Sequence, residues 1–209
     1  MSPHTQRVAV TGPAGAIDCA LDEPRGDASA GHVVGTVVVC HPHPQHGGTM
    51  DNKVVQTVAR AFVQMGWRAV RFNFRGVGGS AGEWDHGRGE VDDALAVIAA
   101  QRVPGARFAL AGFSFGAYVA TQAAHRLPDD AKPERLLLVG PAVVNFDMAP
   151  VSDDTLVVHG EADDVVPLAA VLDWARPQAL PVVVVPGVGH FFHGQLTVLK
   201  NLILRSWRA

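Results

Sequence analysis

Three segments of the chain carry side chains that could act together in nucleophilic catalysis. Ser114 lies at the centre of the pentapeptide 112–116, which has the pattern G-x-S-x-G. A serine hydroxyl is a poor nucleophile near neutral pH and needs a base beside it, which an acidic side chain in turn orients. Acidic residues follow in segment 160–167, and His190 follows in segment 186–192. This order of serine, acid and histidine predicts catalysis by an activated serine.

The segments on either side of Ser114 indicate how the serine would be presented. Residues 107–111 are short and largely apolar, as in a buried strand, and residues 117–124 have the composition of a helix. The pentapeptide between them is predicted to form a sharp turn, the nucleophile elbow, which lifts the hydroxyl clear of the sheet. Glycines at its two ends allow the backbones to approach without Cβ clashes.

The rest of the chain predicts strands and helices that alternate from about residue 33. Segments 6–11 and 15–21 are expected to form an antiparallel hairpin at a sheet edge. The other predicted strands are 33–40, 67–72, 134–139, 155–159 and 182–185, and the other predicted helices are 52–65 with Asp51 as its N-cap, 89–101, 168–174 and 190–206. Such alternation predicts an α/β fold: a doubly wound, mainly parallel β-sheet with helices on both faces. In these sheets the chemistry lies in the loops that follow the strands.

Length and composition limit the classes of partner. The 209 residues are expected to form a single domain, 1–209, with 48% hydrophobic residues and a net charge of −3. This weakly acidic balance favours neither nucleic acid nor an anionic membrane as partner. Cys19 and Cys40 fit a reducing compartment, and residues 1–7 have no apolar leader, so a cytoplasmic location is expected. Apolar residues on the first hairpin leave a homodimer possible.

Several motifs resemble those of one known superfamily. The motif G-x-x-D-x-x-V-P at 160–167 and the motif G-x-G-H at 187–190 look like the acid and base loops of α/β-hydrolases. Segment 73–80 resembles their R-G-x-G-x-S loop, although Asn73 stands where many members carry Asp, a change we expect to be structural. Segment 41–52 resembles a subgroup of small, lidless bacterial hydrolases described mostly as predicted esterases. The resemblance covers roughly residues 33–195 and implies the α/β-hydrolase fold.

The resemblance also implies a role for each candidate residue. Ser114 would be the nucleophile, His190 the general base and acid, and Asp163 the carboxylate that orients the imidazole. Competing acids are Glu161 and Asp164 in the same loop and Asp147 after the preceding strand, any of which could instead have a structural role. His193, further along the predicted closing helix, would be a pocket residue.

An oxyanion hole needs two backbone N–H groups. The resemblance assigns one to Phe115, directly after the nucleophile, and the other to the loop after strand 33–40. Pro42 and Pro44 have no N–H, which leaves His41, His43 and Gln45 as candidates. Alignment of His41-Pro42 with the His-Gly pair of the family favours His43.

Loop lengths and apolar residues point to a class of substrate. Only about fifteen residues, 140–154, separate two predicted strands, too few for a cap domain. The open cleft expected there would be walled by aromatic and aliphatic residues: Phe113, Phe115, Val143, Phe146, Phe191 and Phe192. We therefore predict hydrolysis of small carboxylic esters through an acyl-enzyme, with a small-molecule acyl substrate and no cofactor. Alternatives are a thioesterase, a dienelactone-type or other acyl hydrolase on the same triad, or a non-catalytic scaffold used for binding.

Two further patterns suggest other chemistries. His41, His43 and His46 form H-x-H-x-x-H, which could bind a metal, but no matching carboxylate or cysteine cluster appears, so no metal site is predicted. Segment 76–81 approaches a dinucleotide-binding motif, yet the acidic residue required after a following strand is missing.

Overall fold

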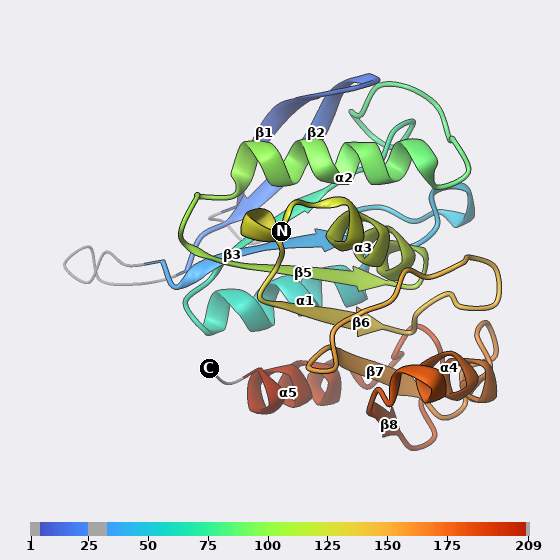
Figure 1. Ribbon diagram of the computed structural model, residues 1–209. Coiled ribbons are helices and arrows are strands. Elements are labelled where there is room, and N and C mark those ends of the chain that lie inside the picture. The colour runs from blue at the N-terminus through green and yellow to red at the C-terminus, as the bar shows by residue number, and fades with distance from the viewer. Residues whose placement is uncertain (1–4, 25–32, 208–209) are drawn as a thin grey trace.

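An eight-stranded sheet forms the centre of the molecule (Figure 1). The computed structural model describes residues 5–24 and 33–207. The strands are β1 (Thr5–Gly12), β2 (Gly15–Asp22), β3 (Gly35–Cys40), β4 (Arg68–Phe72), β5 (Arg107–Phe113), β6 (Arg135–Val139), β7 (Leu156–Gly160) and β8 (Val182–Val185). Their order across the sheet is β1-β2-β4-β3-β5-β6-β7-β8. Strand β3 is buried at all six positions, because helices cover both of its faces.

The direction of the strands confirms the predicted doubly wound sheet. β1 and β2 form an antiparallel hairpin at one edge, and β2 is antiparallel to β4. From β4 to β8 every neighbouring pair is parallel. The carboxyl ends of β5, β7 and β8 therefore meet at one edge of the sheet.

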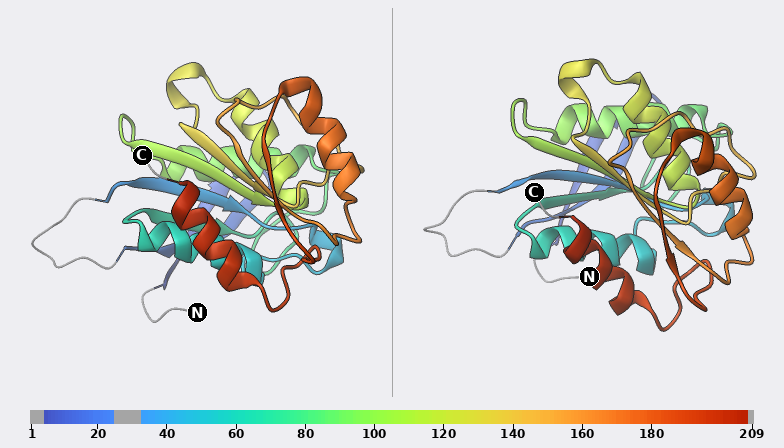
Figure 2. Two further views of the ribbon diagram at one scale, coloured as in Figure 1. Left: turned by 90° about the horizontal axis from the view of Figure 1, so that it is seen from below. Right: turned by 60° about the horizontal axis from the view of Figure 1, so that its bottom comes forward.

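Helices lie on both faces of the sheet (Figure 2). The helices are α1 (Lys53–Gln64), α2 (Arg88–Gln101), α3 (Phe115–Arg126), α4 (Leu168–Ala175) and α5 (Leu196–Ser206). α1 and α5 pack side by side on one face, where Phe62, Trp67 and Trp207 form edge-to-face aromatic contacts. α2, α3 and α4 cover the other face. The connection 140–155, described throughout, contains no helix, so the fold has no lid over the carboxyl edge.

Two expectations about helix ends were wrong. Asn52, not Asp51, caps α1: its Oδ1 accepts hydrogen bonds from the N–H groups of Val54 and Val55 at 2.9 and 3.5 Å. The closing helix begins at Leu196 rather than at residue 190. Residues 190–195 form turns because the backbone at Phe192 has a φ of 53°, which no right-handed helix tolerates. His193 consequently lies in this loop and not on the helix. In the parts of the chain that the structure describes, no helix is both long and apolar enough to span a bilayer.

Candidate active site

The turn that carries Ser114 has strained backbone geometry. Ser114 lies between β5 and α3 with φ 56° and ψ −119°, a conformation that side chains rarely adopt. Gly112 and Gly116 flank this turn, and at both positions a larger side chain would clash with backbone atoms. A Cβ on Gly112 would come within 2.2 Å of the Gly116 carbonyl oxygen, and a Cβ on Gly116 would come within 2.2 Å of the Cys40 carbonyl oxygen. The turn is thus packed tightly against the end of β3.

Ser114, His190 and Asp163 form a continuous chain of hydrogen bonds. Ser114 Oγ lies 3.0 Å from His190 Nε2, and His190 Nδ1 lies 2.7 Å from Asp163 Oδ2. Because an ionised carboxylate only accepts, Nδ1 carries the hydrogen and Nε2 is left to accept from the serine hydroxyl. All three residues are buried. They follow β5, β8 and β7 respectively, so the parallel sheet brings together residues that are far apart in the sequence.

Asp163 is the acid that the structure brings to His190. Its Oδ1 accepts the N–H groups of Val165 and Val166 at 2.9 and 2.8 Å. Burial opposes ionisation, but the hydrogen bonds from His190 and Val166 outweigh it and hold the pKa of Asp163 below its ordinary value. The carboxyl group is therefore suited to remain charged beside the imidazole.

The competing acids lie elsewhere. Glu161 accepts the Gly187 N–H at 2.9 Å and so joins the acid loop to the base loop. Asp164 and Asp147 are exposed. The N-cap of α4 is Pro167, so neither acid of this loop caps that helix.

The imidazole of His190 is held between an aromatic ring and a glycine. The ring of Phe113 lies against it with centroids 4.9 Å apart. On the backbone side, a Cβ on Gly140 would come within 3.2 Å of His190 Cε1. These contacts restrict movement of the imidazole and keep it between Asp163 and Ser114.

The loop after β3 is fastened by His41. Its Nδ1 donates to the Pro42 carbonyl oxygen at 2.6 Å, and its Nε2 accepts the Phe74 N–H at 3.0 Å. Burial lowers the pKa of His41 to about 4, so the imidazole is neutral near pH 7. His41 thereby joins the loop that contains His43 to the end of β4.

Two backbone N–H groups near Ser114 are candidates for an oxyanion hole. Phe115 is the first residue of α3, where backbone N–H groups have no partner within the helix and the helix dipole favours negative charge. His43 lies in the loop that packs on the elbow, since a Cβ on Gly116 would also come within 2.6 Å of the His41 carbonyl oxygen. The imidazole of His43 accepts the Gln45 N–H at 3.2 Å.

The histidine-rich loop does not have the geometry of a metal site. Both ring nitrogens of His41 are engaged in hydrogen bonds within the protein. The rings of His43 and His46 stack on each other with centroids 4.4 Å apart. Across residues 5–24 and 33–207, no group of three or more His, Cys, Asp or Glu side chains is arranged to hold a metal ion.

The expected pocket residues differ widely in exposure. Phe113, Phe115 and Phe192 are fully buried, Phe146 and Val143 are partly buried, and Phe191 is 43% exposed. Phe146 packs on Phe115 with ring centroids 5.0 Å apart.

This aromatic cluster has two members that sequence analysis missed, Trp84 and Tyr118. Trp84 contacts His43 at 4.5 Å between ring centroids, and Tyr118 contacts Phe146 at 4.9 Å. Tyr118 lies four residues after Ser114, one helical turn along α3, and this spacing could have identified it. The position of Trp84 depends on the irregular segment 73–87, for which no periodic signal exists.

Asn73 has a structural role, as expected. It is buried, its Oδ1 accepts the Met50 N–H at 2.9 Å, and its Nδ2 donates to Asp18 Oδ2 at 3.2 Å. It therefore joins β2 to the loop before α1 rather than contacting Ser114, Asp163 or His190.

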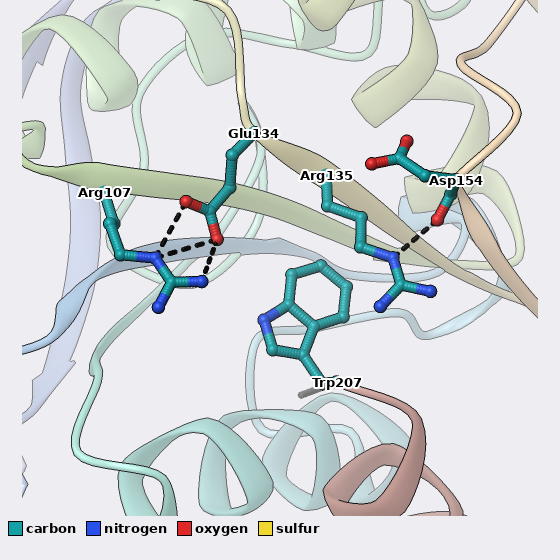
Figure 3. A pocket seen from close by; sticks show the side chains of 5 residues that line it. All are labelled: Arg107, Glu134, Arg135, Asp154 and Trp207. Atoms are coloured by element: carbon teal, nitrogen blue, oxygen red, sulfur yellow. Dashed lines mark hydrogen bonds and ion pairs between the residues drawn. The ribbon is translucent and has the colours of Figure 1, made fainter. Parts of the chain in front are cut away.

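A separate cavity of about 270 Å³ lies at the opposite, amino edge of the strands (Figure 3). Its two guanidinium groups are already engaged: Arg107 forms a bidentate pair with Glu134, and Arg135 donates to the Ser206 carbonyl oxygen at 2.8 Å. Trp207 lies between them. This cavity offers no nucleophile and is remote from Ser114, which lies at the carboxyl end of β5.

Together, the mainly parallel eight-stranded sheet, the serine on its strained turn and the lack of a lid define a lidless protein of the α/β-hydrolase fold. Comparison with known proteins gives the family. Residues 31–152 match the family model described as "Serine aminopeptidase, S33", and the chain belongs to this family of α/β-hydrolases.

Solved structures and a curated relative support this assignment. A crystal structure of XC6422 from Xanthomonas campestris, described as an a/b serine hydrolase without lid, is 40% identical, with a TM-score of 0.86 over 99% of this chain and 94% of that one. An alpha-beta serine hydrolase homologue from Coxiella burnetii is 38% identical, with a TM-score of 0.82 over 97% of each chain. The uncharacterized protein RP471 of Rickettsia prowazekii is 34% identical over 171 residues, 74% of this chain and 71% of that protein.

Proposed function

We propose that the protein is a serine hydrolase that cleaves small carboxylic esters through Ser114, His190 and Asp163. The observation that carries the proposal is the hydrogen-bond chain from Ser114 Oγ through His190 to Asp163, with heavy-atom distances of 3.0 and 2.7 Å. Both distances lie within the range that proton transfer in catalysis requires. Membership of a family of serine hydrolases supports the same conclusion.

The first half of the reaction forms an acyl-enzyme. His190 Nε2 takes the proton of the Ser114 hydroxyl as Oγ attacks the carbonyl carbon of the ester. Asp163, charged and hydrogen bonded to Nδ1, stabilises the imidazolium that results. The N–H groups of Phe115 and His43 donate to the oxyanion of the tetrahedral intermediate. His190 then protonates the leaving alcohol, and the acyl group remains on Ser114.

The second half returns the enzyme to its starting state. Water takes the place of the alcohol, His190 removes a proton from it, and the hydroxide attacks the acyl carbon. Collapse of the second tetrahedral intermediate breaks the bond to Ser114 Oγ, which recovers its proton from His190. The products are a carboxylic acid and free enzyme.

The surroundings of Ser114 favour a small acyl group. The connection 140–155 forms no lid, and the partly buried rings of Trp84, Tyr118 and Phe146 offer apolar surface near the elbow. The family description names a serine aminopeptidase, which makes an amide substrate the second candidate, because the same triad can cleave ester and amide bonds. Buried free thiols at Cys19 and Cys40 fit a reducing compartment, in line with our proposal of a cytoplasmic enzyme.

Labelling with a fluorophosphonate probe tests the proposal. Wild-type protein is expected to take up one label, mapped by mass spectrometry to Ser114, and heat-denatured protein to take up none. Ser114→Ala is expected to abolish both labelling and hydrolysis of p-nitrophenyl acetate while the protein stays folded. A parallel assay with an aminoacyl p-nitroanilide separates ester from amide hydrolysis. Unlabelled, folded wild-type protein would contradict a serine mechanism and favour a binding scaffold.

A further inference from the structure

One buried histidine beside the triad has no role in the reaction described above. His159 is the penultimate residue of β7 and is fully buried. It does not contact Ser114, yet its Nε2 lies 3.5 Å from Asp163 Oδ2, the same oxygen that accepts from His190. Imidazoles are rarely placed in an apolar interior without a partner that requires them.

The hydrogen bonds of His159 define its tautomer. Nε2 lies 2.9 Å from the Val166 carbonyl oxygen, which can only accept, so Nε2 carries the hydrogen. Nδ1 then holds a lone pair, and within the described part of the chain this buried nitrogen has no hydrogen-bond partner. Burial lowers the pKa of His159, against the opposing effects of Asp163 and of the Val166 hydrogen bond, so the ring stays neutral. A buried acceptor without a partner costs stability, so filling space alone does not explain a histidine here.

Val166 connects His159 to the acid of the triad. Its N–H donates to Asp163 Oδ1 at 2.8 Å, while its carbonyl oxygen accepts from His159. Val166 thus binds the Asp163 carboxylate through its N–H group and the His159 imidazole through its carbonyl oxygen. Without the His159 hydrogen bond, the turn that contains Val166 could move. The Val166 N–H holds Asp163 Oδ1, so this movement would also displace Asp163 Oδ2.

Neither an apolar nor a positively charged side chain could replace this contact. An apolar residue would leave the Val166 carbonyl oxygen buried without a donor. A Lys or Arg would bring a positive charge next to Asp163 and compete with His190 for its carboxylate. The site needs a neutral hydrogen-bond donor, and the Nε2–H tautomer of histidine supplies it.

We propose that His159 is a positioning residue of the triad: through Val166 it holds the Asp163 carboxylate in the orientation that lets Oδ2 accept from His190. The proposal rests on the function proposed above. It assigns His159 no contact with the substrate.

Two variants of similar length separate this role from simple packing. In His159→Gln the amide nitrogen ends near the position of Nε2 and can still donate to Val166, whereas His159→Met fills the same space without a donor. We expect His159→Met to lower kcat by roughly tenfold to a hundredfold with KM nearly unchanged, because a small misplacement of a catalytic group has effects of this size. His159→Gln is expected to recover most of that loss. If His159→Met does not fold, His159→Asn replaces it, since its shorter amide cannot reach Val166.

Proton NMR gives a readout that does not depend on turnover. The hydrogen between His190 Nδ1 and Asp163 should give a far-downfield resonance, assigned by its loss in His190→Ala. We expect this resonance to be retained in His159→Gln and to shift or broaden in His159→Met, with thermal unfolding showing that both are folded. An unchanged resonance and unchanged kcat in His159→Met would overturn the proposal, as would equal losses in the Gln and Met variants. If wild-type protein shows no Ser114-dependent hydrolysis, the proposed function fails, while the resonance still decides whether His159 positions Asp163.

Discussion

Gly160 and Val188 lie so close together that a Cβ added to Gly160 would come within 2.2 Å of the Val188 carbonyl oxygen. Gly160 ends β7 and begins the acid loop, and Val188 lies in the base loop two residues before His190. The Ala162 N–H also donates to the Val188 carbonyl oxygen at 2.9 Å. The contact between these two loops is therefore part of what brings Asp163 to His190.

Substitution of Gly160 should damage both the fold and the site. Gly160→Ala is expected to lower the free energy of unfolding by about 1–3 kcal/mol, since the atom in the way is rigid backbone. Activity should fall because the two loops must separate. Gly189→Ala is the matched control: its Cβ would meet only the Ala162 carbonyl oxygen at 3.6 Å, an ordinary contact. Urea unfolding measures both, and equal stabilities would show that the loops adjust without cost.

Strain at Ser114 predicts a gain in stability when the side chain is removed completely. At φ 56° and ψ −119° a Cβ is unfavourable, at a cost of about 1–3 kcal/mol. Ser114→Gly and Ser114→Ala should both be inactive, yet Ser114→Gly should be the more stable of the two. In a helix, glycine should have the opposite effect on stability. Ala99→Gly, at an exposed position in α2, should lower the free energy of unfolding by about 0.5–1 kcal/mol. Greater stability of Ser114→Ala would mean that the turn holds no strain.

The sheet and the position of Ser114 could be predicted because their signals are local. Apolar runs such as 107–111 mark buried strands, and G-x-S-x-G at a strand end requires a tight turn. The alternation of strands and helices then places the ends of β5, β7 and β8 at one edge. This topology predicts that Ser114 meets the loops after β7 and β8, whereas the choice of Asp163 over Glu161, Asp164 and Asp147 rests on its place in the motif G-x-x-D-x-x-V-P.

The details that sequence analysis missed depend on contacts between distant segments. Asp51 and Asn52 are both good N-caps, and only the geometry of the preceding turn selects Asn52. The start of α5 depends on the positive φ of Phe192, a residue type that gives no warning of it. The position of His159 beside Asp163 Oδ2 follows from the fold of the acid loop alone.

The choice of Asp163 as the acid gives a sharp kinetic prediction. Asp163→Asn preserves size but removes the charge and favours the wrong tautomer of His190, so kcat should fall by about 10³- to 10⁴-fold. Asp164→Asn is the control, because Asp164 is the exposed neighbour in the same loop. Steady-state hydrolysis of p-nitrophenyl acetate compares the two. Comparable losses in both variants, or activity retained in Asp163→Asn, would move the role of the acid away from Asp163.

Lowering the pH should destabilise the protein, because the buried imidazole of His41 resists protonation. In the folded protein burial lowers the pKa of His41 to about 4, from an ordinary value of 6.5. Between these values the unfolded chain binds a proton that the folded protein does not. Stability is therefore fully present above pH 6.5 and falls as the pH decreases to 4, by roughly 3 kcal/mol for this group. His159, whose pKa is also lowered, contributes in the same direction.

Urea unfolding at several pH values between 7 and 4 tests this dependence, with His41→Asn as the comparison. The variant should be less stable at pH 7, because the Phe74 N–H loses the acceptor that lies 3.0 Å away in the wild type. It should also lose stability less steeply on acidification, because it has no imidazole at this position to protonate. Parallel curves for the two proteins would show that other groups cause the acid sensitivity. Since His41 fastens the loop that contains His43, weaker catalysis and slower labelling of Ser114 in folded His41→Asn at pH 7 would further support the assignment of the oxyanion hole to this loop, because both reactions develop negative charge on an oxygen.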